Sequence, residues 1–152
     1  MSTATMISDD AFLGARSDYP ALKILLAEHD RHLRLLASIA LRFDGHDVEE
    51  VSDGSEMLEL MAGTIMDRDK RPFDLLITAN ELPGIPGFTV LAGLRARHWE
   101  TPFILMTDDA EIQMRAGRLG AVVLGRPSNI KAIRSAVGEA YALGGARVAG
   151  IS

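Results

Sequence analysis

The sequence predicts a doubly wound α/β domain, with a five-stranded parallel sheet in the order 2-1-3-4-5 between two helical layers. Five short apolar segments alternate with five segments of helical periodicity, which is typical of strands joined by crossover helices. Most of the strand segments are continuously apolar, as expected of strands that are covered on both faces. Right-handed crossovers then favour the doubly wound strand order.

Length and composition set the outer limits of the chain's organisation. The 152 residues suit one domain, and we expect an N-terminal arm at 1–20, the folded domain at 21–143 and a C-terminal tail at 144–152. The absence of cysteine excludes disulfides and thiol chemistry. A net charge of −5 argues against nonspecific binding of nucleic acid or anionic membranes. The N-terminus lacks the pattern of a secretion signal, so a cytoplasmic location is expected.

The first strand and helix have clear boundaries in the sequence. Residues 22–28, LKILLAE, form a continuous apolar run of strand length. Residues 30–43 follow with helical spacing of apolar positions, and Asp30 is suited to cap the helix N-terminus. Gly45 is expected to end this helix.

The next elements are a weaker strand and a second helix. Residues 46–52, HDVEEVS, have strand character with more polar positions, and residues 55–66 have an apolar helical side. The charged link at 64–72 is expected to be an exposed loop. Residues 73–79, FDLLITA, are predicted as the third and most clearly buried strand.

The loop at residues 84–87, which contains Pro86 and directly follows Pro83, opens the third predicted helix at 88–98. The apolar segment PFILMT at 102–107 is predicted as the fourth strand. The short fourth helix is predicted at 110–119, and Asp109 is suited to cap it.

Residues 121–125, AVVLG, are predicted as the fifth strand. The last helix is predicted at 129–142, with Ser128 as its N-cap. Gly144 and Gly145 are expected to end it. A further short turn of helix is expected at 10–15.

Five motifs in this order resemble those of response-regulator receiver domains of the chemotaxis-regulator type. The resemblance covers about residues 22–143 and implies a flavodoxin-like fold and a role in bacterial two-component, or phosphorelay, signalling. Each motif ends at, or follows, the carboxyl edge of the predicted sheet, where such folds bind ligands. The motifs are ILLAEHD (24–30), DLLITA (74–79), LPGIPG (82–87), PFILMT (102–107) and LGAVVLGRPSN (119–129).

The phosphoacceptor position departs from the family pattern. In receivers the third strand ends in an aspartate that accepts a phosphoryl group, and the matching residue here is Ala79. A methyl group has no lone pair with which to attack phosphorus. The resemblance therefore implies an atypical receiver, or pseudo-receiver, with a degenerate phosphorylation site.

The family's magnesium site is also incomplete. Glu28 matches the first of two metal-binding acids, whereas His29 occupies the place of the second and Asp30 lies one position further on. Magnesium prefers hard oxygen ligands, so its binding is expected to be weak or absent, with no cofactor. A softer metal on these three residues is an alternative, but adjacent side chains at a strand end diverge. Glu28 and Asp30 remain as a weak metal-binding possibility.

The other family positions are partly retained. The resemblance assigns Thr107 to the hydroxyl that binds the phosphoryl oxygen, and Arg126 to the conserved lysine, followed by a cis proline. Arginine is not equivalent to lysine there, and we expect Arg126 to pair with Glu28 or Asp108. Asp108 either obstructs the site mouth or contributes to helix capping. Val123 replaces the switch aromatic residue.

Asn80 and Glu81 follow Ala79 in the loop after the third strand. Loop polar residues are usually solvated, so this interpretation is favoured for both. The alternative is that they form a ligand pair at the edge of the sheet.

Together these departures predict a stand-alone receiver that acts by phosphorylation-independent protein–protein interaction and is not an enzyme. The implied partner is a signalling protein such as a histidine kinase or an effector, and a homodimer through the last two helices and the fifth strand is a further possibility. The alternative function is a small-ligand or nucleotide sensor that uses the crevice at the carboxyl edge. The residues expected on the interaction face, unless they form an ordinary solvated surface, are Ile112, Arg115, Arg118, Val123, Lys131 and Arg134.

Overall fold

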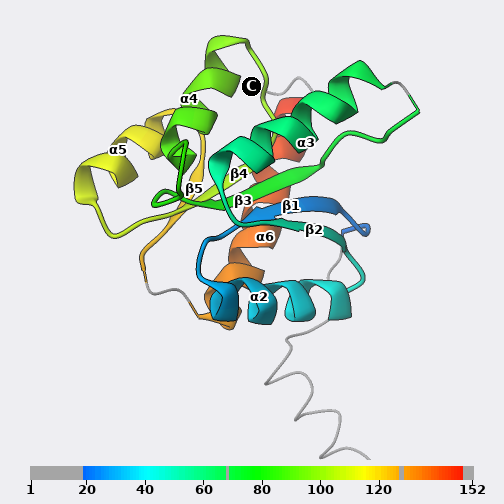
Figure 1. Cartoon of the computed structure of the whole chain (residues 1–152), viewed down its shortest axis with the longest axis horizontal. Helices are drawn as coiled ribbons and strands as arrows, with labels where there is room; N and C mark the ends of the chain where they lie inside the picture. The colour runs from blue at the N-terminus through cyan, green and yellow to red at the C-terminus, as the bar shows by residue number, and fades with distance from the viewer. Residues whose placement is uncertain (1–18, 68, 127–128, 149–152) are drawn as a thin grey trace, which may run out of the picture.

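The computed structural model describes residues 19–67, 69–126 and 129–148, and in residues 145–148 only the backbone. Its five parallel strands have the order β2-β1-β3-β4-β5. Helices α2 and α6 cover one face of the sheet, and α3, α4 and α5 cover the other (Figure 1). The predicted fold class and strand order are confirmed. The strands are β1 (Lys23–Ala27), β2 (Asp47–Val51), β3 (Leu75–Ala79), β4 (Phe103–Met106) and β5 (Val122–Leu124).

Five helices connect and follow these strands, and their boundaries lie close to the predicted ones except at the end of α6. They are α2 (Arg31–Phe43), α3 (Gly54–Met66), α4 (Gly87–Ala96), α5 (Ala110–Arg118) and α6 (Ile130–Val148). Some predictions fall outside the described residues. They are the turn of helix at 10–15, most of the N-terminal arm, the cis peptide bond at Pro127 and the helix cap at Ser128.

Local side-chain bonds explain where several helices begin. The Asp30 carboxylate accepts a hydrogen bond from the Leu33 amide at 3.0 Å, and the Asp109 carboxylate accepts bonds from the first turn of α5. Both predicted caps are therefore confirmed. Gly45 follows α2 with a φ of 98°, a left-handed conformation that glycine adopts without strain.

The end of α6 differs from the prediction, because the helix continues through Gly144 and Gly145 to Val148. Gly144 is buried against the strand layer. A Cβ at Gly144 would lie 2.5 Å from Cγ of Pro102, so glycine here permits close packing of the helix rather than its termination. The prediction treated a packing glycine as a stop signal.

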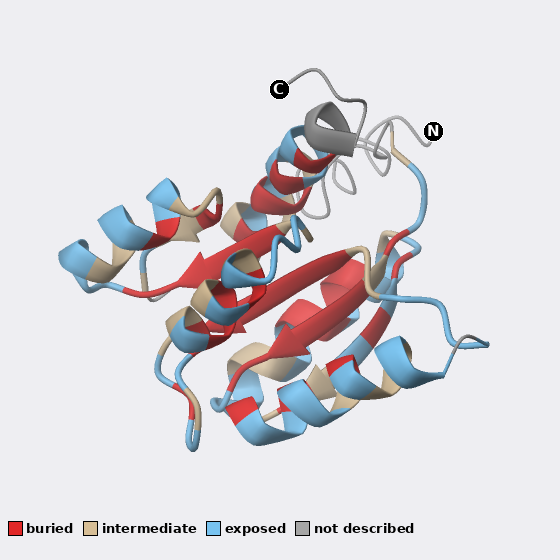
Figure 2. Ribbon diagram, turned by 90° about the horizontal axis from the view of Figure 1, so that it is seen from above, coloured by how far each residue is buried: buried red, intermediate tan, exposed pale blue. Residues whose placement is uncertain are grey.

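The core is centred on the three middle strands, which are buried along almost their whole length (Figure 2). Apolar side chains of β1, β3 and β4 are enclosed by helices on both faces, as the continuous apolar runs predicted. This burial fixes the carboxyl ends of β1, β3 and β4 beside one another. None of the helices in the described part of the chain is long and apolar enough to cross a membrane.

Candidate functional site

The candidate site lies where β1, β3 and β4 end together. Ala27 is paired with Thr78, and Ala79 is paired with Met106, so the residues that follow these strands meet at one edge. Ala79 is fully buried at the end of β3. Its methyl group is enclosed at the position where the resemblance places the phosphoacceptor.

Asn80 connects the end of β3 to the start of α4. Its amide donates to the Met106 carbonyl at 2.9 Å, and its side-chain oxygen accepts from the Phe88 amide at 2.9 Å. Gly87 packs so closely that a Cβ there would collide with the Ala79 carbonyl oxygen. The Asn80 side chain thus stabilises the first turn of α4, a structural role that the sequence analysis did not identify.

An ion pair joins Glu28 and Arg126 at this edge. The Glu28 side chain is only 2% exposed, and Nη1 of Arg126 donates to its Oε1 at 2.6 Å. The second carboxylate oxygen of Glu28 accepts from the Asp30 amide at 2.8 Å. The hydrogen bond to Glu28 is the main reason that the pKa of Arg126 is raised. Of the two partners proposed from the sequence, Arg126 therefore takes Glu28, and Asp108 is exposed.

Glu81 reaches from the loop after β3 to the end of β4. Its Oε2 accepts from the Thr107 hydroxyl at 3.2 Å, which is long for a bond of this kind, and from Asn80 Nδ2 at 3.2 Å. Thr107 is fully buried, and its hydroxyl also accepts from the Asp109 amide. The carboxylate of Glu81 therefore engages the hydroxyl that the resemblance assigns to phosphoryl binding.

The residues at the family's metal position do not converge. Glu28 is buried in its pair with Arg126, His29 is exposed, and Asp30 is occupied as a helix cap. The Leu33 amide is the main reason that the pKa of Asp30 is lowered. Within the described ranges, no group of three or more histidine, aspartate or glutamate side chains is arranged to hold a metal ion. The donor set does not fit the octahedral oxygen site that magnesium requires.

The residues of the expected interaction face have several different surroundings. Arg134 forms a two-point ion pair with Asp44 at the end of α2, with bonds of 2.7 and 2.5 Å, and its side chain is 12% exposed. Arg115 lies 4.6 Å from the centre of the Phe88 ring. Ile112 and Val123 pack against the core. Arg118 and Lys131 are exposed.

The order of these motifs and their meeting at one edge agree with a comparison against protein families. Residues 24–137 match the response regulator receiver domain. The chain belongs to this family. It is thus the receiver domain of a two-component response regulator, with the β2-β1-β3-β4-β5 sheet described above.

Similar proteins place this receiver domain among bacterial signalling proteins. It is 33% identical over 129 residues to the response regulator protein FleR of Pseudomonas aeruginosa, covering 82% of this chain and 25% of FleR. It is 32% identical over 128 residues to the sensor histidine kinase AruS of the same organism, covering 78% of this chain and 12% of AruS. The chain therefore spans a quarter or less of the length of these two relatives.

Solved structures support the receiver fold. The chemotaxis response regulator CheY4 of Vibrio cholerae matches with a TM-score of 0.66 and 23% identity, covering 80% of this chain and 99% of CheY4. The receiver domain of the Francisella response regulator 1452 matches with a TM-score of 0.67 and 22% identity, covering 80% of this chain and 97% of that domain. At these identities the likeness concerns the fold alone.

Proposed function

We propose that this receiver domain acts by phosphorylation-independent protein–protein interaction. The observation that carries the proposal is Ala79, which places a buried methyl group at the phosphoacceptor position. Phosphoryl transfer to protein needs a nucleophilic oxygen or nitrogen at the point of attack, and a methyl group supplies neither.

Two further contacts support this proposal. Arg126 is bound to Glu28, so the cation at the family's lysine position is already neutralised by a buried carboxylate. Glu81 accepts from Thr107, so the hydroxyl at the phosphoryl-binding position also has a carboxylate partner. Both groups that would meet an incoming phosphoryl group are engaged inside the protein, and a second negative charge would be repelled there.

The proposed partner is a histidine kinase or an effector, which contacts the surface of α5, β5 and α6. Arg118 and Lys131 are exposed basic residues of this face, whereas Arg134 is held by Asp44 and the exposed Arg115 lies over Phe88. The same face is the proposed contact of a homodimer. Signalling in this proposal involves no catalytic step.

The sequence analysis also left open a ligand sensor at the carboxyl edge. Such a site would need Arg126 to be available to a ligand, but its guanidinium is bound to Glu28. We therefore favour protein interaction over ligand sensing at this edge.

The decisive experiment offers the protein a small phosphodonor. The full chain is incubated with acetyl phosphate and magnesium, and its intact mass is measured over time, with a phosphorylatable receiver as the positive control. We expect no phosphoryl adduct on this chain under conditions that label the control. A stable adduct in near-stoichiometric yield, at any carboxylate, would refute the proposal.

The interaction face is tested separately by light scattering after gel filtration. Arg118→Glu and Lys131→Glu reverse charge on the proposed face, and Arg31→Glu does so on α2, where it serves as the matched control. If the chain dimerises through α5 and α6, only the first two substitutions are expected to shift it towards the monomer. An equal effect of all three would count against this face.

A further inference from the structure

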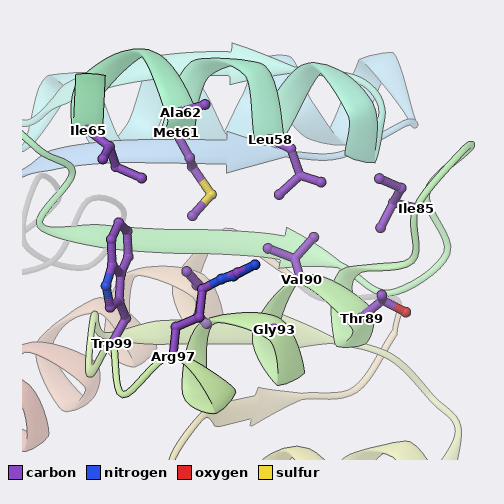
Figure 3. A pocket seen from close by; sticks show the side chains of 11 residues that line it. Leu58, Met61, Ala62, Ile65, Ile85, Thr89, Val90, Gly93, Arg97 and Trp99 are labelled. Atoms are coloured by element: carbon purple, nitrogen blue, oxygen red, sulfur yellow. The ribbon is translucent and has the colours of Figure 1, made fainter. Parts of the chain in front are cut away.

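An apolar groove of about 490 Å³ lies between α3 and α4, and at one end it reaches Ile85 in the loop after β3. Side chains of the two helices point toward one another across it (Figure 3). A pocket of this volume lies within the range of about 300–1,000 Å³ that holds small organic ligands. The apolar walls include Leu58, Met61, Ile65, Val90, Gly93 and Leu94.

The groove exists partly because α4 carries a glycine where it faces α3. A Cβ at Gly93 would meet no atom within 4 Å, so the space beside it is open. Glycine within a helix costs about 0.5–1 kcal/mol relative to alanine. No close backbone contact accounts for glycine at this position, in contrast to Gly87 on the same helix. A larger side chain at Gly93 would instead fill the groove.

Large apolar side chains beside this groove remain partly exposed. Ile65 is 53% exposed, Leu58 is 39% exposed and Trp99 is 37% exposed. The Trp99 ring stands at one end of the groove, and Ile85 stands at the other (Figure 3). A ligand between these two ends would remove apolar surface from water on both helices, at about 25 cal/mol per Å² buried.

One cation points into this apolar space. The Arg97 side chain extends from the end of α4 into the groove beside Gly93 (Figure 3). Across the described part of the chain, its guanidinium makes no ion pair and no hydrogen bond, whereas Arg71, Arg126 and Arg134 each pair with a carboxylate. An anion beside Arg97 would gain a charge-assisted bond next to apolar walls, where such bonds are stronger than in water.

We propose that the α3–α4 groove binds a small amphipathic carboxylic acid. The apolar body of the ligand lies along Met61 and Val90 against the Trp99 ring, and its carboxylate binds Arg97. The walls supply burial, and the single cation supplies orientation and selectivity for an acid. The groove shares no lining residue with the site around Ala79, Thr107 and Arg126, and the proposal does not rest on phosphorylation-independent signalling.

The test uses the full chain and decanoate as the probe, with 1-decanol as its uncharged counterpart. Trp99 is the only tryptophan in the sequence, and it lines both this groove and a neighbouring pocket beside Phe73. Its emission therefore reports binding, and the groove variants described below assign that binding to the groove. We expect decanoate to change the emission saturably, with one ligand per chain. We expect 1-decanol to bind about tenfold more weakly or worse, because it cannot form the charge-assisted bonds to Arg97.

Two substitutions distinguish binding in the groove from binding elsewhere on the surface. Arg97→Gln is expected to weaken decanoate binding about tenfold, and Gly93→Leu is expected to abolish it by filling the space. The matched controls are Arg31→Gln on α2 and Gly117→Leu on α5, where a Cβ also meets nothing within 4 Å, and both are expected to bind normally.

Thermal unfolding checks that each variant is folded. If Gly93→Leu does not fold, Ala62→Leu provides a second variant that fills the groove. The proposal is overturned if decanoate gives no saturable change, if 1-decanol binds equally well, or if a folded filling variant binds as the wild type does. It is also overturned if the filling variants weaken the binding of a protein partner while no small acid binds the groove.

Discussion

Arg126 and Glu28 are 98 residues apart in the sequence, and at the carboxyl edge of the sheet Nη1 of Arg126 donates a hydrogen bond of 2.6 Å to Oε1 of Glu28. The Glu28 side chain is 2% exposed and that of Arg126 is 24% exposed. A carboxylate buried to this degree needs a charged partner to remain ionised at low cost. The pair therefore binds the loop after β5 to the end of β1, at the centre of the candidate site.

We predict that Arg126→Gln destabilises the fold, because it leaves the buried Glu28 carboxylate without its cation. Breaking a fully buried pair costs about 3–5 kcal/mol, and the partial exposure of Arg126 reduces our expectation to about 2–3 kcal/mol. Urea unfolding at neutral pH measures the change. The control is Arg71→Gln, which breaks the exposed Arg71–Asp74 pair and should cost about 0–1 kcal/mol.

The double variant Glu28→Gln/Arg126→Gln removes both charges and should recover part of the lost stability. Equal unfolding free energies for Arg126→Gln and Arg71→Gln would show that the Glu28–Arg126 pair stabilises the fold no more than an exposed ion pair does.

A second prediction concerns restoration of phosphorylation. Ala79→Asp alone should remain unlabelled by acetyl phosphate, because His29 still replaces a metal-binding acid and Arg126 is bound to Glu28. The triple variant Ala79→Asp/His29→Asp/Arg126→Lys should become labelled in a magnesium-dependent manner. Intact mass spectrometry with and without magnesium measures both.

The matched control for the triple variant carries asparagine in place of aspartate at position 79, and it should stay unlabelled. Full labelling of the single Ala79→Asp variant would mean that His29 and Arg126 do not impair the site. Our account of those two positions would then be wrong.

A third prediction compares two glycines of α4. Gly87→Ala places a Cβ against the Ala79 carbonyl oxygen, which belongs to the backbone and cannot move aside easily. We expect a loss of about 1–3 kcal/mol in the free energy of unfolding. Gly93→Ala enters open space and should stabilise the fold by about 0.5–1 kcal/mol. Urea unfolding of both variants provides the comparison, and changes of the same sign would contradict it.

Sequence patterns predicted the sheet order and the caps at Asp30 and Asp109, because these depend on periodicity and on bonds to residues two or three positions away. They reduced the partner of Arg126 to two candidates, because both lie at strand ends. They could not predict that Arg134 binds Asp44, since that pairing depends on how α6 lies against the end of α2. They also missed the bond from Thr107 to Glu81, because loop side chains have no periodicity that shows where they point.

The glycines show the same limit. Gly144 has the residue type of a helix stop, but its function is set by Pro102 on a distant segment, and the helix continues. Gly93 has no local signature that marks a groove. Both roles depend on how closely two elements pack, and the sequence pattern along one element cannot predict that distance.

The last prediction concerns the dependence of stability on pH at His46. This side chain is buried, and its Nδ1 accepts from the Leu22 amide at 3.0 Å, so the neutral imidazole is the form that fits. Tyr19 stacks on the ring with centroids 5.7 Å apart. Burial lowers the pKa of His46 from its ordinary value of 6.5, and the nearby Asp44 carboxylate opposes this shift.

Because the folded pKa lies below the unfolded one, the unfolded chain binds the proton more readily. The stability due to neutral His46 is therefore fully present above pH 6.5, and it falls as the pH decreases below that value towards the folded pKa. One extra proton gives a slope of at most about 1.4 kcal/mol per pH unit. His46→Asn, whose side-chain oxygen can accept from the Leu22 amide without titrating, should reduce the loss of stability between pH 7.5 and 5.5. Urea unfolding at both pH values tests this, with a substitution of the exposed His98, His98→Asn, as the control. If the wild type and both variants lose the same unfolding free energy, His46 does not take up a proton on unfolding.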